Sequence, residues 1–297
     1  MKTKVKKERR EKFTPLTIFM LVVLCVYCVA MGILFLFAIM MAFQDPLMWM
    51  YPTVLPYGDV YFGNFHAVLS VQLKVISGVT TVYSTMGDII FNSVVYALGC
   101  GLVNTIVTCV TAYLCATYKY KYSKIIHTTV IVVMTIPIIG SQAAELGLLN
   151  ALNLYNTWLG LLILKANFLG MYFLIFYEMF ASLPITYREA ATLDGADDWR
   201  VMFSVYFPLA KATFGTILLI NFINFWNDYQ TPMLYAPSHP TLSRYLIEIA
   251  IMSTANDFDS VPIRMTTSII LSVPTLILFL IFQKKLMSNL TIGGIKG

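Results

Sequence analysis

Six long apolar segments, separated by shorter polar stretches, dominate the pattern of this chain. Each has about 20 residues or more, the length that a helix needs to cross the hydrocarbon core of a bilayer. The predicted crossing helices are 16–43, 88–117, 125–148, 158–181, 212–235 and 263–282. The first run is too long for a signal peptide and no small-residue cleavage site follows it, so we expect an uncleaved helix. The pattern predicts an all-α integral membrane protein with about six transmembrane helices.

Composition agrees with this class, and the distribution of charge orients the chain. Apolar residues make up 58% of the 297 positions and charged residues 12%, against about a quarter charged in soluble domains. Sixteen of the 20 Lys and Arg residues lie in the N-terminus, the loops after spans two and four, and the tail. Basic residues accumulate on the cytoplasmic side, so we expect both termini there. The net charge of +5 is then explained by membrane insertion, and no nucleic-acid partner is needed.

The two long outer segments differ from the short cytoplasmic loops. Residues 44–87 are aromatic and poor in basic residues, and two readings stay open: they rest on the membrane interface, or they contact an extracytoplasmic partner. Residues 236–262 begin with a turn at Pro237–Pro240. The apolar spacing that follows predicts an amphipathic helix through Leu242, Tyr245, Leu246 and Ile249. The chain thus divides into a basic N-terminus (1–15), a first helix (16–43), an extracytoplasmic segment (44–87), a transmembrane core (88–282) and a cytoplasmic tail (283–297).

A polar island at 184–211 interrupts the apolar core on the cytoplasmic side. Tyr187, Ala191 and Gly195 are four residues apart and share one helix face. Gly195 suits the end of that helix, and Asp197 suits the cap of a second one. The spacing predicts a helix–turn–helix knob between spans four and five. Spacing alone leaves two readings open: a knob that docks into a soluble protein, or an interfacial helix that packs on its own bundle.

The residues of this island carry a resemblance to a known family. The pattern E-A-A-x-x-x-G, followed by Pro208, resembles the signature loop of the membrane subunits of binding-protein-dependent ABC importers. In that family the loop is the coupling helix that docks into the ATPase subunit. The resemblance therefore assigns ATPase coupling to Glu189, Ala190, Ala191, Asp194 and Gly195.

Further motifs are similar to sugar permeases of the maltose-transporter type, and the similarity covers about residues 85 to 297. They are the turn 152–157, the Trp226-Asn227 pair and the Gly-rich ending 290–297. The resemblance implies a permease of a bacterial-type cell membrane that imports an oligosaccharide. Its implied partners are a second homologous permease, two ATPase subunits docked at 184–200 and an extracytoplasmic sugar-binding protein. ATP and Mg would bind to the ATPase subunits.

The chain itself lacks the motifs of an enzyme. No G-x-x-x-x-G-K-[ST] phosphate loop occurs, and no nucleophile has a base near it in the sequence. The three histidines show no metal spacing, so we expect no metal site and no cofactor in this chain. The five cysteines, including the Cys25-x-x-Cys28 pair, lie in apolar runs and are interpreted as small buried residues.

Polar residues within the predicted spans are candidates for the translocation pathway. Charges at this depth cost about 2.5–3.5 kcal/mol on insertion scales and are usually paired or line a wet cavity. A short outer loop joins the spans that hold Glu145 and Lys165, so we expect these two to pair or to hydrogen-bond a sugar. The alternative for Lys165 is snorkelling to the outer interface. Amides and aromatics of the fifth span suit sugar hydroxyls and interhelical hydrogen bonds alike: Asn221, Asn224, Trp226 and Asp228.

Two further classes of function stay open at this stage. One is an ABC permease for a solute other than a sugar, and the other is an ion-coupled secondary carrier. A secondary carrier should show intramembrane carboxylates in a repeat-related arrangement, which the sequence does not display.

Overall fold

The computed structural model describes residues 14–48, 58–70, 72–77, 80–118, 120–136, 140–252 and 260–290. The basic N-terminus and the Gly-rich ending lie outside these ranges. The helices are α1 (Pro15–Ala42), α2 (Gly63–Leu69), α3 (Met86–Thr117), α4 (Lys121–Thr135), α5 (Gln142–Ala151), α6 (Trp158–Lys165), α7 (Met171–Ala181), α8 (Thr186–Leu193), α9 (Asp198–Val201), α10 (Phe207–Asn227), α11 (Gln230–Tyr235), α12 (Leu242–Met252) and α13 (Val261–Leu290). A π-helical turn, Met202–Tyr206, joins α9 to α10, and two strands, β1 (Gln72–Ser77) and β2 (Thr80–Thr85), precede α3.

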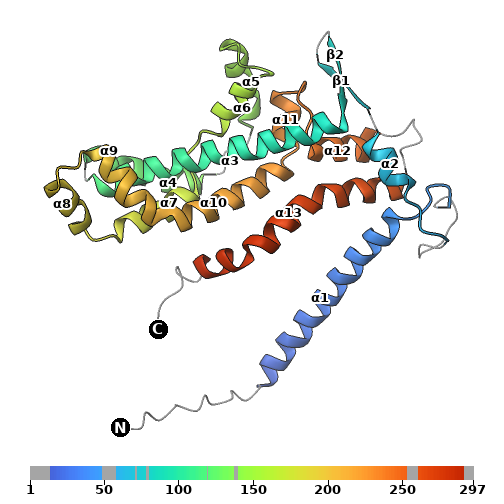
Figure 1. Ribbon diagram of the computed structural model, residues 1–297, viewed down its shortest axis with the longest axis horizontal. Coiled ribbons are helices and arrows are strands. Elements are labelled where there is room, and N and C mark those ends of the chain that lie inside the picture. The colour runs from blue at the N-terminus through green and yellow to red at the C-terminus, as the bar shows by residue number, and fades with distance from the viewer. Residues whose placement is uncertain are drawn as a thin grey trace.

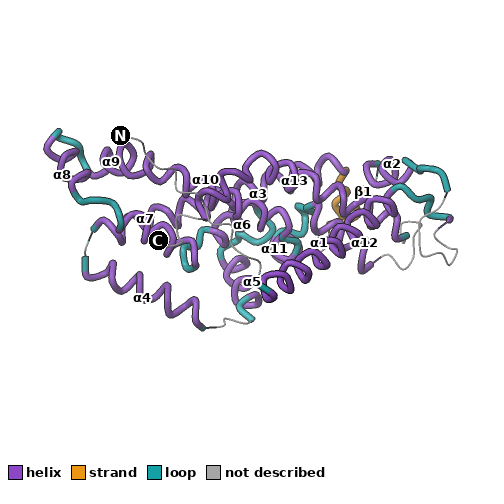
Figure 2. Tube along the Cα trace, turned by 90° about the horizontal axis from the view of Figure 1, so that it is seen from below, coloured by secondary structure: helices purple, strands orange, loops and turns teal. Residues whose placement is uncertain are grey.

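The long helices α3 and α10 run side by side through the centre of the molecule, with α13 next to them and α1 at the edge (Figure 1). The knob α8–α9 lies at one end of this bundle. The hairpin β1–β2, α2 and α12 lie at the other end (Figure 1). The tube in Figure 2 shows α4 along the side of the bundle near α7.

Four helices of the described part are long and apolar enough to cross a membrane: Pro15–Ala42, Met86–Thr117, Asp198–Asn227 and Val261–Gln283. The predicted spans 125–148 and 158–181 are instead each built from two shorter helices, α4 with α5 and α6 with α7. The predicted fifth span also differs, because the helix begins at Asp198 inside the polar island and not at residue 212. Pro208 would clash with the carbonyl of Ser204 in a regular helix, and the π-helical turn lies at this place.

The all-α prediction needs one correction. Strands β1 and β2 form an antiparallel hairpin in which Leu73 pairs with Ser84 and Gln72 with Thr85. The hairpin leads directly into α3, whose first turn carries a capping box between Thr85 and Asp88. Both strands contain β-branched residues, which favour extended chain. They lie in the outer segment 44–87, to which the sequence pattern assigned neither helix nor strand.

Three clusters of buried side chains hold the bundle together, and α3 contributes to each of them. Its Gly101 faces the backbone of α10, where an added Cβ would make an ordinary contact of 3.5 Å with the amide nitrogen of Phe222. The cysteines differ in burial according to the helix that carries them. Cys100, Cys109 and Cys115 are buried, whereas Cys25 and Cys28 are exposed on α1, so the expectation that all five are buried is wrong.

The tight turn before α6 yields a first prediction. Thr157 caps α6 by accepting from the amide of Gly160 at 3.1 Å and donates to the carbonyl of Leu154 at 2.7 Å. A Cβ at Gly160 would collide with that carbonyl oxygen. We expect Gly160→Ala to destabilise the protein by about 1–3 kcal/mol and to lower its Tm in detergent. Gly147→Ala is the control, because a Cβ at Gly147 meets nothing within 4 Å; equal Tm values for the two variants would contradict the prediction.

Candidate functional site

A break in the helix between α6 and α7 organises the polar residues at the centre of the bundle. Residues 166–170 are not helical, so the last carbonyls of α6 lack partners within their own helix. Asn104 of α3 supplies them, because its Nδ2 donates to the carbonyls of Lys165 at 3.1 Å and Asn167 at 2.9 Å. Thr108 donates to the same Asn167 carbonyl at 3.4 Å. Side chains of α3 therefore satisfy backbone carbonyls at the break between α6 and α7.

Asn221 of α10 extends this cluster to a third element. Its Nδ2 donates to Asn104 Oδ1 at 2.9 Å and to Thr105 Oγ1 at 3.0 Å, and the residue is only 3% exposed. One turn later, Asn224 donates to the hydroxyl of Tyr172 at 3.4 Å. Both amides were predicted from the sequence, with substrate or interhelical hydrogen bonds as open roles, and the contacts that the structure shows are interhelical.

A cavity of about 220 Å³ lies at this break. Uncharged polar side chains and aromatic rings line it, together with Gly170. The polar lining consists of Asn104, Thr108, Asn167, Tyr172 and Asn221. Amides and hydroxyls next to rings suit a ligand with both hydroxyl groups and apolar faces. Asn104 and Asn167 were not predicted as site residues, although an Asn in an apolar run is a signal of this kind.

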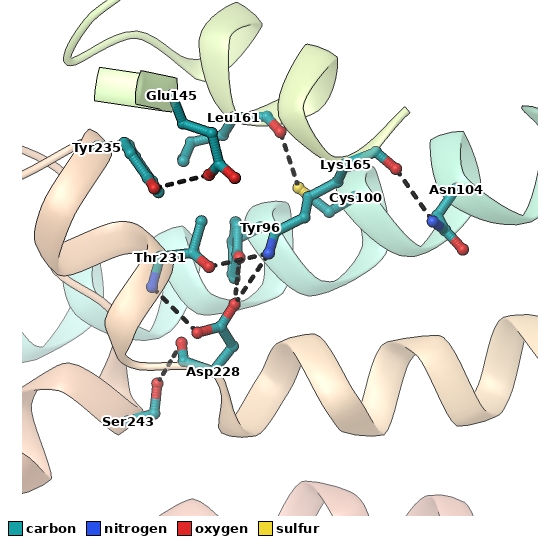
Figure 3. A network of polar contacts seen from close by, with 10 residues as sticks. All are labelled: Tyr96, Cys100, Asn104, Glu145, Leu161, Lys165, Asp228, Thr231, Tyr235 and Ser243. Carbon is teal, nitrogen blue, oxygen red and sulfur yellow. Dashed lines mark hydrogen bonds and ion pairs between the residues drawn. The ribbon is translucent and has the colours of Figure 1, made fainter. Parts of the chain in front are cut away.

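Lys165 and Asp228 form an ion pair at the other side of the break (Figure 3). Lys165 Nζ lies 3.4 Å from Asp228 Oδ2 and donates to Thr231 Oγ1 at 2.9 Å. Tyr96 donates to the same Asp228 oxygen at 2.8 Å, and the amide of Thr231 donates to Asp228 Oδ1 at 3.1 Å. The carbonyl of Asp228 accepts from Ser243 at 3.0 Å. Asp228 thus joins α3, α6, α11 and α12 at the point where α10 ends.

The predicted pairing of Lys165 with Glu145 is therefore replaced by a different one. Glu145 of α5 accepts from the hydroxyl of Tyr235 at 2.7 Å (Figure 3). The physical reason is the end of α10 at Asn227, which turns the Asp228 carboxylate toward α6. Snorkelling of Lys165 does not describe its position either, because its ammonium group is paired inside the bundle.

Trp226 is buried between α10 and α13. Its indole Nε1 donates to the carbonyl of Leu271 at 2.8 Å, and its side chain is 2% exposed. The ring stacks on Phe222 at a centroid distance of 5.6 Å. Trp226 thereby fastens α10 to α13, and it does not line the cavity described above.

The knob follows the sequence prediction closely in its local structure. Helix α8 ends at Leu193, Gly195 has φ +78°, and Asp197 accepts from the amide of Arg200 to cap α9. The amide of Ala196 donates to the carbonyl of Ala191 at 3.0 Å, a bond of the type that closes a helix at a left-handed glycine. Glu189, Ala190, Asp194 and Gly195 are exposed, whereas Ala191 is half-buried against the bundle.

Large apolar side chains project from the knob. Leu193 is 88% exposed and Trp199 is 69% exposed, and no residue of α8 is buried. A soluble protein rarely exposes side chains of this size together unless another surface covers them. Neither residue was individually predicted from the sequence to be part of a docking surface.

Comparison with known proteins places these features in a family. A family model described as "Binding-protein-dependent transport system inner membrane component" matches residues 108–292. The chain is 26% identical over 209 residues to the arabinooligosaccharides transport system permease protein AraQ of Bacillus subtilis (strain 168), covering 70% of this chain and 73% of AraQ. It is 28% identical over 209 residues to the sulfoquinovosyl glycerol transport system permease protein SmoH of Agrobacterium fabrum, covering 70% and 73%.

A solved structure supports the fold. A chain from a bacterial ABC transporter involved in the import of the acidic polysaccharide alginate superposes with a TM-score of 0.77 at 18% identity, over 92% of this chain and 99% of that one. The matched family region includes the knob, the helix break and the Lys165–Asp228 pair. The chain belongs to the family of inner membrane components of binding-protein-dependent transport systems, and it is a multi-pass permease subunit of an ABC importer in the bacterial cell membrane.

Proposed function

We propose that this chain is one of two permease subunits of an ATP-driven importer that moves an oligosaccharide delivered by an extracytoplasmic binding protein. The observation that carries this proposal is the knob 184–200, which lies at one end of the bundle (Figure 1) and exposes Leu193 and Trp199. A second homologous permease would complete the pathway, and two ATPase subunits would supply ATP and Mg. The chain itself would not hydrolyse ATP.

In this proposal the bundle crosses the membrane about six times, with both termini and the knob on the cytoplasmic side. Helix α4 has 15 residues and would span about 22 Å, which is shorter than the hydrocarbon core. The third and fourth crossings would therefore each be completed by two shorter helices, α4 with α5 and α6 with α7. The concentration of Lys and Arg in the loops beside the knob supports the orientation.

The relatives support a sugar as the substrate, since AraQ and SmoH are named for an arabino-oligosaccharide and a glycoside. The cavity at the α6–α7 break adds a chemical argument, because its amides, hydroxyls and rings suit a saccharide unit. The residues that line the cavity carry no charge, and Lys165, close to it in sequence, is paired with Asp228. We infer that a neutral saccharide fits this pathway better than an acidic one.

The coupling role of the knob predicts the effect of changes at its turn. Gly195 has φ +78° and open space around it, so Gly195→Arg strains the backbone by about 1–2 kcal/mol and places a long cation on the docking surface. We expect Gly195→Arg and Glu189→Lys to abolish ATP-dependent uptake at normal membrane levels of the protein. Gly195→Asn is the control, because Asn tolerates this backbone conformation. Normal uptake by both charged variants would remove the coupling role.

The cavity predicts that filling it impairs the affinity for sugar. Gly170 lines the cavity, has an extended backbone and has no atom within 4 Å of an added Cβ. Gly170→Leu should therefore fold and should raise the KM of uptake by about tenfold or more, the loss expected when about 1.4 kcal/mol of binding is removed. Gly32→Leu adds the same side chain in open space on α1. The panel of labelled probes is arabinotriose, maltotriose and an alginate trisaccharide; equal KM values for both variants would exclude the cavity.

The ion pair predicts a rescue by double substitution. Lys165 and Asp228 are about one-fifth to one-quarter exposed, so the loss of one partner should cost about 1–2 kcal/mol, less than for a fully buried pair. We expect Lys165→Met and Asp228→Asn each to lower the Tm in detergent, and the double variant to recover it. Uptake that recovers together with Tm assigns a structural role to the pair. Uptake that stays low in a stable double variant assigns a contact with the substrate, and Glu145→Ala serves as the neighbouring comparison.

A further inference from the structure

The side chain of Arg188 connects the knob to the segment between α3 and α4, which is not adjacent to the knob in sequence. Its guanidinium carbon lies 4.4 Å from the centre of the Tyr118 ring, just beyond the end of α3. The same group lies 3.5 Å from the carboxylate of Asp198 on α9. One side chain of α8 therefore contacts the end of α3 and the start of α9 together.

Tyr118 occupies the elbow between α3 and α4. Its amide donates to the carbonyl of Leu114 at 3.1 Å, and its own carbonyl accepts from Ser123 Oγ at 2.6 Å. Its ring meets Tyr113 edge-on at 6.1 Å, and Tyr113 packs in the same way on Tyr206 at 5.1 Å. A displacement of the Tyr118 ring would therefore act on α3 and on α4.

The chemistry of the contact favours a cation on a neutral ring. Burial raises the pKa of Tyr118, so its phenol stays protonated at physiological pH and the ring offers its π face. A guanidinium can stack on this ring and donate to Asp198 at the same time. The compact ammonium of a lysine cannot reproduce this planar arrangement.

Other connections of the knob lead elsewhere. The chain itself links α8 to α7 through 182–185, and it links α9 to α10 through the π-helical turn. Helix α8 has no buried residue, and Ala191 makes a partly buried apolar contact with the core. The Arg188 contact is thus a polar, directional attachment of α8 to the α3–α4 elbow.

We propose that Arg188 is a positioning residue for energy coupling, which transmits movement of the knob through Tyr118 into α3 and α4. The proposal rests on the coupling role proposed above and adds the route by which force reaches the helices that hold the break at 166–170. Asn104, which satisfies the carbonyls at that break, lies on the same helix α3. Because Asn104 also lines the cavity, movement of α3 would then change the shape of the cavity.

The test uses the assembled importer, reconstituted in proteoliposomes with its ATPase subunits and binding protein, and the labelled trisaccharides named above. Uptake and ATP hydrolysis are measured separately, and their ratio is the readout. We expect Arg188→Lys and Tyr118→Leu each to lower the ratio about fivefold, while the ATPase subunits still co-purify. Tyr118→Phe keeps the ring and should keep the ratio. Because both residues act through the same contact, the ratio for the double variant should be no lower than the ratio for the more impaired single variant.

Arg200→Lys is the matched control, since it makes the same substitution at an exposed position of the knob. An unchanged ratio in Arg188→Lys would overturn the proposal. Loss of co-purified ATPase in this variant would also overturn it, because Arg188 would then maintain the docking surface and not transmit movement. Absence of ATP-dependent uptake for every probe in the unmodified importer would instead refute the proposed oligosaccharide transport, and the ratio inference would fall with it.

Discussion

The hydrocarbon interior of a bilayer offers no hydrogen bonds, so every peptide group at that depth must find a partner in the protein. An unbroken helix meets this constraint by itself, as α3 does over 32 residues. The predicted span that contains α6 and α7 does not, because residues 166–170 leave the helix. The amide of Asn104 replaces the missing partners there, and Asn221 in turn holds Asn104. The packing of α6, α7 and α10 around α3 depends on this small set of amides.

The same constraint explains the ion pair at the end of α10. The helix stops at Asn227 and resumes as α11 at Gln230, which again leaves polar groups to satisfy. Asp228 accepts from Tyr96 and Thr231 and is paired with Lys165. Charges at such depth are tolerated when they are paired and hydrogen-bonded. Helix interruptions and polar side chains therefore occur together, because the side chains bond the groups that the interruptions leave without partners. The cavity lies beside the break between α6 and α7.

The knob obeys the opposite condition. It lies at one end of the bundle (Figure 1), its first helix has no buried residue, and its large apolar side chains are exposed. Its few attachments to the bundle are specific ones, of which the Arg188–Tyr118 contact is polar and directional. An element with few contacts to the bundle and exposed apolar side chains suits a part that binds another protein and moves with it. The amides at the centre and the knob at the end are the two parts that the proposed coupling would connect.

The sequence by itself determined much of this protein. Apolar runs of sufficient length located the helices, since the bilayer imposes a length on them. The E-A-A-x-x-x-G spacing located the knob and the family, because helix caps and a left-handed Gly195 are encoded by neighbouring residues. The amphipathic helix α12 was confirmed for the same reason, as its periodicity is local.

Only the tertiary structure decided that α4 ends at Thr135 and α5 begins at Gln142, that residues 166–170 leave the helix, which carboxylate pairs with Lys165, and what Trp226 contacts. An apolar run reads the same whether it forms one helix or two, because the break is stabilised by a side chain such as Asn104 that lies about 60 positions away. Glu145 and Asp228 were both possible partners of Lys165. Because α10 ends at Asn227, the carboxylate of Asp228 lies close to Lys165 and forms the ion pair. Local sequence fixes which segments are helical and what caps them, whereas contacts between distant segments decide where a buried charge or a freed carbonyl finds its partner.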